Sequence, residues 1–350
     1  MKKIFKKGGR VIIALLFVGT LTATTTSTQP SIFDLMHHQE VLEVTLETDI
    51  ELLKSDRALE QSLPARLSFV DATGKEQYWR LKVEQRGRFR RMTCSDVPPL
   101  KLKFKKADLH IAGLAKFNDM KLVTQCVKDK AEAQILLKKE FLGYKLYNEL
   151  SPNSFRVQLL RITYKDTNTK KKRKQWAFLI EDTAQLRARM GAEKCEGCYN
   201  LSPDRFDADE LQQLALFQYM IGNADWSLKH LRNVKLMRKE GRIIVVPYDF
   251  DFSGLVAAPY AIPSPDLGQR SIRQRLYLGF EEDPKELEAG LSVLKGKKKQ
   301  LLDLLKSQRY LSIVHRREVK DYLKEFFDGT TIEWPMGQGA NSVRSVVEAE

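Results

Sequence analysis

Apolar and polar positions alternate through much of the first third of the chain. The alternating stretches cover residues 41–46, 65–70, 78–84 and 100–104, and residues 121–123 form a shorter candidate. An alternation of period two is typical of strands that bury one face. The sequence therefore predicts an antiparallel sheet over the part of the chain that ends near residue 126.

The pattern changes to a helical period over residues 130–150. On a helical wheel, Glu140 lies among apolar and aromatic positions. These positions are Ala133, Leu136, Leu137, Gly143, Tyr144 and Tyr147. A carboxylate in such surroundings is costly unless a cation meets it. We expect Glu140 either to have a buried basic partner or to lie in water at the edge of the apolar stripe.

The second half of the chain alternates short strands with helices. In chain order these are strands at 157–164 and 175–180, a helix at 207–221, strands at 233–237 and 243–246, and helices at roughly 284–306 and 311–328. The loop after the helix at 207–221 carries Asp225. The strand at 243–246 runs almost directly into Asp249 and Asp251.

The N-terminus has the pattern of a secretory signal peptide. Five basic residues and no acid lie within 1–10, an apolar run follows over 11–19, and small and hydroxyl residues continue to 28. We expect residues 1–23 to be removed and 24–38 to be a linker. An uncleaved anchor helix is the alternative. The mature protein is expected in the cell envelope, either secreted or periplasmic, without a stable membrane span.

The four cysteines fit that compartment, because exported cysteines tend to pair. Cys94 and Cys126 both flank strand-like segments, so we expect them to form one disulfide. The pattern places Cys195 and Cys198 in a loop, where we expect them to form a small disulfide or stay free. The histidine spacings do not match a zinc site.

Composition supports a folded protein and argues against a nucleic-acid partner. Hydrophobic residues make up 43% and charged residues 30% of the chain, which excludes a disordered chain. The formal charge is +14, and +9 remains once the five basic residues of the leader are subtracted. The densest basic run, 170–174, lies between two strand patterns, where a charged run is usually a solvated turn.

The order of candidate residues indicates phosphoryl transfer, a reaction that needs positioning and charge neutralisation more than covalent catalysis. A loop carboxylate such as Asp225 can accept a hydroxyl proton. Asn233 and Asp249 carry the oxygen ligands that Mg²⁺ prefers. A lysine on an early strand, tied to Glu140, would neutralise nucleotide phosphates. This order predicts a two-lobed protein-kinase-like α+β fold, with an N-terminal antiparallel sheet lobe and a mainly helical C-terminal lobe.

The sequence resembles the spore-coat CotH kinase family over about residues 80–255. The resembling residues are Gln85-Arg86-Gly87-Arg88, Pro99-Leu100-Lys101-Leu102-Lys103-Phe104, Lys121-Leu122-Val123, Gly222-Asn223-Ala224-Asp225 through Asn233, and Pro247-Tyr248-Asp249-Phe250-Asp251. The resemblance implies ATP-dependent phosphorylation, with Mg²⁺ or Mn²⁺, of Ser or Thr on an envelope or secreted protein.

The resemblance also assigns roles to individual residues. It implies that Asp225 is the base and that Asn233 and Asp249 bind metal, with Asp251 as a helper. Lys101, Lys103 or Lys121 would meet the phosphates, and the residues do not choose among the three lysines.

The sequence differs from the kinase pattern in three respects. The family's R-G-x-S stretch reads R-G-R-F here, and no G-x-G-x-x-G is present. Asp225 and Asn233 are eight residues apart, whereas the ordinary kinase loop H-R-D-x-x-x-x-N has a spacing of five. The alternative function is therefore a catalytically silent kinase-like binding or scaffold protein of the cell envelope.

The predicted organisation places a sheet-rich lobe with the 130–150 helix over residues 39–182. A C-terminal lobe with the catalytic-type loop follows over 183–330, and residues 331–350 form a tail.

Overall fold

The computed structural model describes residues 29–94, 96–280, 283–329, 331–335 and 343–345. The expected signal peptide, residues 1–23, lies outside the described residues. Of the expected linker, residues 32–36 form helix α1 (Ile32–Met36), whose Ile32, Phe33 and Met36 are fully buried. This part of the segment is therefore packed into the fold.

Seven strands close into a barrel in the order β1-β2-β3-β4-β5-β7-β6. They are β1 (Val41–Thr48), β2 (Leu63–Val70), β3 (Glu76–Gln85), β4 (Leu100–Phe104), β5 (Asp119–Thr124), β6 (Val157–Asp166) and β7 (Lys172–Ile180). Side chains that point inward form a continuous apolar core, which includes Leu46, Leu67, Leu102 and Leu122. The alternation that predicted the strands is the alternation between this core and the outer face.

The expected two-lobed protein-kinase-like fold is wrong. The sheet is not an antiparallel layer, because β1 pairs in parallel with β6, from Val41 opposite Leu159 to Thr48 opposite Asp166, and this pairing closes the barrel. The rest of the chain contains, besides its helices, the three-stranded sheet β10-β9-β8, in which β9 and β10 correspond to the strands predicted at 233–237 and 243–246. The strand pattern was right, but alternation does not reveal which distant strands pair.

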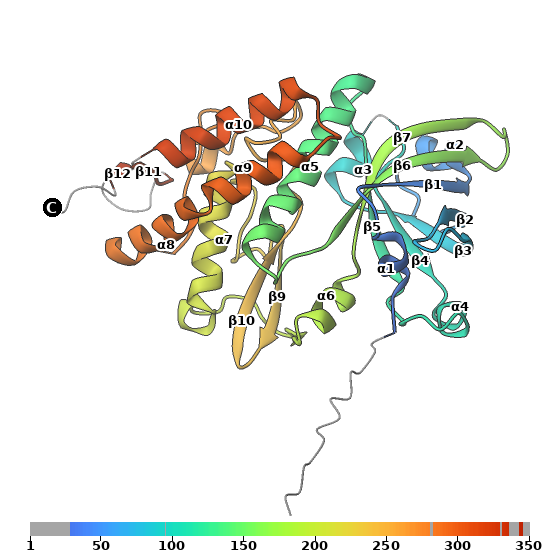
Figure 1. Ribbon diagram of the computed structural model, residues 1–350, viewed down its shortest axis with the longest axis horizontal. Helices are drawn as coiled ribbons and strands as arrows, with labels where there is room; N and C mark the ends of the chain where they lie inside the picture. Colours follow the sequence, from blue (N-terminus) through green and yellow to red (C-terminus); the bar gives the residue numbers. More distant parts are fainter. Residues whose placement is uncertain (1–28, 95, 281–282, 330, 336–342, 346–350) are drawn as a thin grey trace, which may run out of the picture.

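Helix α5 (Lys130–Leu150) lies between the barrel and the helices of the C-terminal half that follow residue 207 (Figure 1). Its N-cap Asp129 accepts a hydrogen bond from the backbone N–H of Glu132. The buried face of α5 contributes Leu137, Phe141 and Tyr144 to a second core. The helix predicted over 130–150 is confirmed with the same bounds.

On the other side of α5 lie four helices and a small sheet, and α7 is the helix that packs against the sheet (Figure 1). The helices are α7 (Ala208–Met220), α8 (Pro284–Gly296), α9 (Lys298–Ser307) and α10 (Ile313–Asp328), and the strands are β8 (Glu193–Lys194), β9 (Val234–Lys239) and β10 (Arg242–Pro247). Short elements complete the chain: α2 (Ile50–Ser55), α3 (Phe89–Thr93), α4 (Lys106–Ile111), α6 (Thr183–Arg189), β11 (Thr331–Glu333), β12 (Val343–Ser345) and two turns of 3₁₀ helix, Pro203–Arg205 and Pro265–Leu267.

Two disulfides are present, Cys94–Cys126 and Cys195–Cys198. The first confirms the expected pairing, and the second settles the alternative for the C-x-x-C loop. Such bonds are typical of proteins outside the reducing cytosol. Among the described helices, none combines the length and apolar character that crossing a bilayer requires.

Candidate active site

Glu140 is fully buried on α5 and has a basic partner. This confirms the first of the two alternatives that the sequence left open for Glu140. The Nη1 atom of Arg90 lies 3.2 Å from Oε1 and 3.1 Å from Oε2 of Glu140. Burial raises the pKa of the Glu140 carboxyl, and the Arg90 charge opposes that rise. The partner is thus an arginine on α3, and none of the three candidate lysines fills this role.

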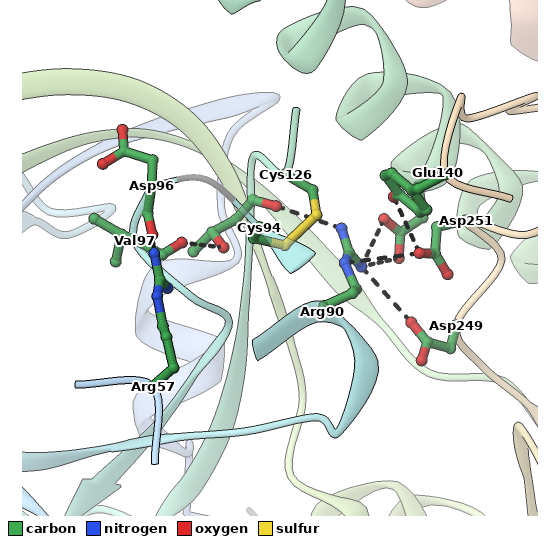
Figure 2. Close-up of a disulfide and its surroundings, with 11 residues drawn as sticks. Arg57, Arg90, Cys94, Asp96, Val97, Cys126, Glu140, Asp249 and Asp251 are labelled. Carbon is green, nitrogen blue, oxygen red and sulfur yellow. Dashed lines mark hydrogen bonds and ion pairs between the residues drawn. A yellow bond between two sulfur atoms is a disulfide. The ribbon is translucent and has the colours of Figure 1, made fainter. Parts of the chain in front are cut away.

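The Cys94–Cys126 disulfide holds the segment that carries Arg90. Cys94 follows directly after the short helix α3, and Cys126 lies just beyond the end of β5. The Nη2 atom of Arg90 also donates to the carbonyl of Thr124, at 3.4 Å. Figure 2 shows the disulfide beside Arg90, whose guanidinium points toward three carboxylates.

Asp249 and Asp251 follow β10 on a segment that docks against α5. Phe250, between them, is fully buried, and its ring centroid lies 4.7 Å from that of Tyr144 and 5.6 Å from that of Phe217. The backbone N–H of Asp249 donates to the Tyr144 hydroxyl at 2.8 Å. Phe250 is buried in the core, while the carboxylates of Asp249 and Asp251 on either side of it lie near Arg90.

Glu140, Asp249 and Asp251, which we call the acidic cluster, bring one carboxylate oxygen each within 4.8 Å of one another. Arg90 lies 3.7 Å from an oxygen of Asp249 and 3.7 Å from an oxygen of Asp251. Asp251 is buried and accepts a hydrogen bond from the Tyr260 hydroxyl at 3.1 Å. Burial raises the pKa of Asp251 to about 6, although Arg90 acts in the opposite direction.

Asp249 is the accessible member of the acidic cluster, with 31% of its side chain exposed. Its φ is +66°, a left-handed conformation that is uncommon outside glycine. Asn233 has a φ of +53°. Asp and Asn adopt this conformation more readily than other residues with side chains, so both positions can turn the chain here.

Asp225 and Asn233 meet despite their long spacing. The Asn233 amide donates to the Asp225 carboxylate at 2.9 Å and to the Asp225 carbonyl at 2.7 Å. Arg232 makes an ion pair with Asp225 at 3.2 Å. Burial raises the pKa of Asp225, and the charge of Asp249 adds to the rise, so these two carboxylates also interact. The intervening loop bulges enough to bring Asp225, Asn233 and Asp249 into one region.

The three candidate lysines differ clearly in their surroundings. Lys101 pairs with Asp119 at 2.7 Å, and Lys103 pairs with Glu84 at 3.1 Å. Within the described part of the chain, no carboxylate lies at ion-pair distance from Lys121, whose Nζ is 4.4 Å from the centre of the Tyr248 ring. Lys121 is therefore the candidate that is not already neutralised.

The surroundings of Lys121 disfavour the charged form of its side chain. Burial, together with the charges of Arg86 and Lys235, lowers the pKa of Lys121 to about 7, while Asp249 favours the charged form. Lys235 also faces the Tyr248 ring, at 5.4 Å. Cations gathered in this way would be stabilised by an anion placed among them.

The donor set fits a divalent cation. If all its carboxylates are ionised, the acidic cluster carries three negative charges and Arg90 offsets only one. Two charges remain, and carboxylate oxygens are the ligands that Mg²⁺ and Mn²⁺ prefer. Asp249 and Asp251 would hold such an ion, with the amide oxygen of Asn233 as a further donor.

Sequence reasoning missed several residues that build this site. Arg90 comes two residues after Arg88, in a stretch rich in arginine, and no spacing rule distinguishes it. Tyr144 was recognised only as part of the apolar face of α5, and Phe250 only as part of a motif. The buried position of Glu140 was the signal that a cation had to be present.

No known family model matches the chain, and no curated protein sequence is significantly similar to it. The resemblance to the CotH kinases therefore stays a prediction.

Proposed function

We propose that this protein is an exported phosphotransferase, similar in its site to the CotH kinases, that moves the γ-phosphate of ATP to Ser or Thr hydroxyls. The observation that carries the proposal is the convergence of Asp225, Asn233 and Asp249 near Lys121, which has no carboxylate at ion-pair distance among the residues that the structure describes. A complex of a metal ion and a nucleotide requires carboxylates that bind the metal and, next to them, basic side chains that bind the phosphates.

Each residue then has a distinct role. Asp225, with 30% of its side chain exposed, accepts the proton of the substrate hydroxyl. The amide of Asn233 orients that carboxylate, and Asp249 and Asp251 hold the divalent cation. Lys121 meets the phosphates, with Arg86 and Lys235 close by. The bound Mg²⁺ or Mn²⁺ would neutralise charge on the transferring phosphoryl group.

The compartment and substrate belong to this proposal as well. The two disulfides support a place outside the reducing cytosol, and the leader pattern narrows it to a secreted or periplasmic protein. The acceptor would then be an envelope or secreted protein.

The second candidate function is that of a catalytically silent binding protein. The contacts of Arg90 favour it. Arg90 approaches all three carboxylates of the acidic cluster, so the cluster is partly neutralised without any metal. In that case, replacing Asp225 or Asp249 would leave the protein's function in the envelope intact.

The two candidates are separated by a transfer assay with γ-labelled ATP, Mn²⁺ and extracts of envelope proteins. We expect label to enter protein with the wild type and to be lost with Asp225→Ala. The nucleotide-induced thermal shift should survive this substitution, because the base does not hold the nucleotide. Asp321→Ala is the matched control, since Asp321 is exposed on α10. Equal labelling by Asp225→Ala and wild type would refute the assignment of the base.

A further inference from the structure

A groove of about 830 Å³ lies against strands β1–β4 of the barrel, and six of the residues that line it are basic. Its basic residues are Arg66, Arg80, Lys82, Lys103, Lys105 and Lys170, and we call it the basic groove. Glu47 is the acid among its lining residues, and it is paired with Lys165 at 3.0 Å. The lining includes no member of the acidic cluster.

Strand register places these cations directly opposite one another. Arg66 on β2 faces Arg80 on β3, and Lys82 on β3 faces Lys103 on β4. Like charges opposite each other across neighbouring strands destabilise a sheet. Two such pairs in adjacent rows are therefore a cost in the free protein.

Carboxylates that pair with such cations would offset this cost, but they are only partly present. Lys103 is paired with Glu84 at 3.1 Å. Arg66, Arg80 and Lys82 are exposed, and none of them has a carboxylate within 4.0 Å among the residues that the structure describes. An external anion would relieve the repulsion between the opposed arginines, whose planar guanidinium groups suit carboxylates in a bidentate arrangement.

The groove also offers apolar contacts. Pro64, which is exposed, lies in its lining, whereas the neighbouring Ala65, Leu81 and Phe104 are buried in the barrel core. An adjoining hollow of about 380 Å³ shares Glu47, Arg66 and Arg80 with it and adds Tyr78, whose side chain is highly exposed. Apolar and aromatic surface beside cations suits a chain that carries both acidic and apolar groups, whereas a phosphate polymer would use only the cations.

We propose that the basic groove binds an acidic peptide segment, with interspersed apolar residues, of a partner protein. The carboxylates of the segment would lie between Arg66 and Arg80, and its apolar side chains would contact Pro64 and Tyr78. The proposal does not depend on phosphotransfer, since none of the residues assigned to that reaction except Lys103, which the structure ties to Glu84, lines the groove.

The test uses a fluorescein-labelled peptide in which pairs of glutamate alternate with leucine, and measures anisotropy with the full chain at low and moderate salt. We expect binding that weakens as salt rises, because exposed charge interactions are screened. The double variant Arg66→Thr/Arg80→Thr should weaken binding about tenfold, the order expected for the loss of two exposed ion pairs. Thr keeps the strand propensity of the site.

A second readout separates binding from misfolding. Removing the opposed arginines should leave the Tm of the free protein unchanged or raise it, because the like-charge pair is lost. The matched control is Arg317→Gln/Lys320→Gln on α10, where both residues are exposed, and it should bind the peptide like the wild type. Unchanged binding by the Arg66→Thr/Arg80→Thr variant would overturn the proposal. A second outcome would also overturn it. If a peptide with serine in place of leucine binds equally well, and polyphosphate displaces it, the natural ligand of the groove is a phosphate polymer.

Discussion

Arg90 contacts all three carboxylates of the acidic cluster, and the fold hides it from solvent. Removing one partner of a buried ion pair leaves the other charges uncompensated, which typically costs about 3–5 kcal/mol. The site therefore depends on a residue that has no part in the proposed transfer chemistry itself.

We expect Arg90→Met to lower the free energy of unfolding by about 3–5 kcal/mol in the absence of metal. A divalent cation should restore part of that loss, because it replaces the missing positive charge. Urea denaturation with and without Mn²⁺ measures both effects, with Arg317→Met on the exposed face of α10 as the control. If Mn²⁺ stabilises the variant no more than the wild type, the acidic cluster is not a metal site.

Lys121 gives a prediction about proton uptake. Burial lowers its pKa to about 7, so at pH 8 the amine is mostly neutral in the free protein. A bound phosphate favours the charged form and raises the pKa, so nucleotide binding should take up a proton at pH 8 and much less at pH 6.

Calorimetry of ATP binding in buffers of different ionisation enthalpy measures this uptake. Lys121→Met should abolish it, whereas Lys101→Met should not, because Lys101 is already paired with Asp119. Uptake that persists in Lys121→Met would assign the phosphate contact to another residue.

At the scale of elements, α5 unites the site. Glu140 meets Arg90, and one turn later Tyr144 accepts the hydrogen bond from Asp249 and packs on Phe250. The sequence predicted α5 well, because twenty-one residues of consistent helical period leave little ambiguity. It did not identify Arg90, because the short α3 has no periodic pattern and is fixed by a disulfide and by tertiary contacts.

The Cys94–Cys126 disulfide should stabilise the fold and the site together. Its sequence separation is 32, and the chain-entropy account gives a loss of roughly 4 kcal/mol for Cys94→Ser/Cys126→Ser. The pair Cys195–Cys198, with a separation of 3, is a built-in control for which the same account gives roughly 2 kcal/mol.

The disulfide variants should also differ in ligand binding. Loss of the first disulfide frees the segment that carries Arg90, so we expect a smaller thermal shift with ATP and Mn²⁺. Loss of the second should leave that shift unchanged. Equal shifts in both variants would mean that the first disulfide contributes only to stability.

At the scale of the whole molecule, the sequence predicted strands and helices better than their assembly. The parallel pairing of β1 with β6 joins segments more than a hundred residues apart, and the alternation in each strand is the same in an open sheet and in a closed barrel. The expected kinase-like lobes were inferred from the order of functional residues, and order along the chain does not determine how strands pair. Of the candidate residues in that order, Asp225 and Asn233 are joined by a hydrogen bond.

The central claim is that these residues bind a nucleotide through a divalent cation. Isothermal titration calorimetry of ATP into the wild type, with Mn²⁺ and then with chelator, tests it most directly. We predict saturable binding only when Mn²⁺ is present, its loss in Asp249→Ala, and its retention in Asp321→Ala. ATP binding of equal affinity with and without Mn²⁺, or ATP binding that Asp249→Ala leaves unchanged, would contradict the claim.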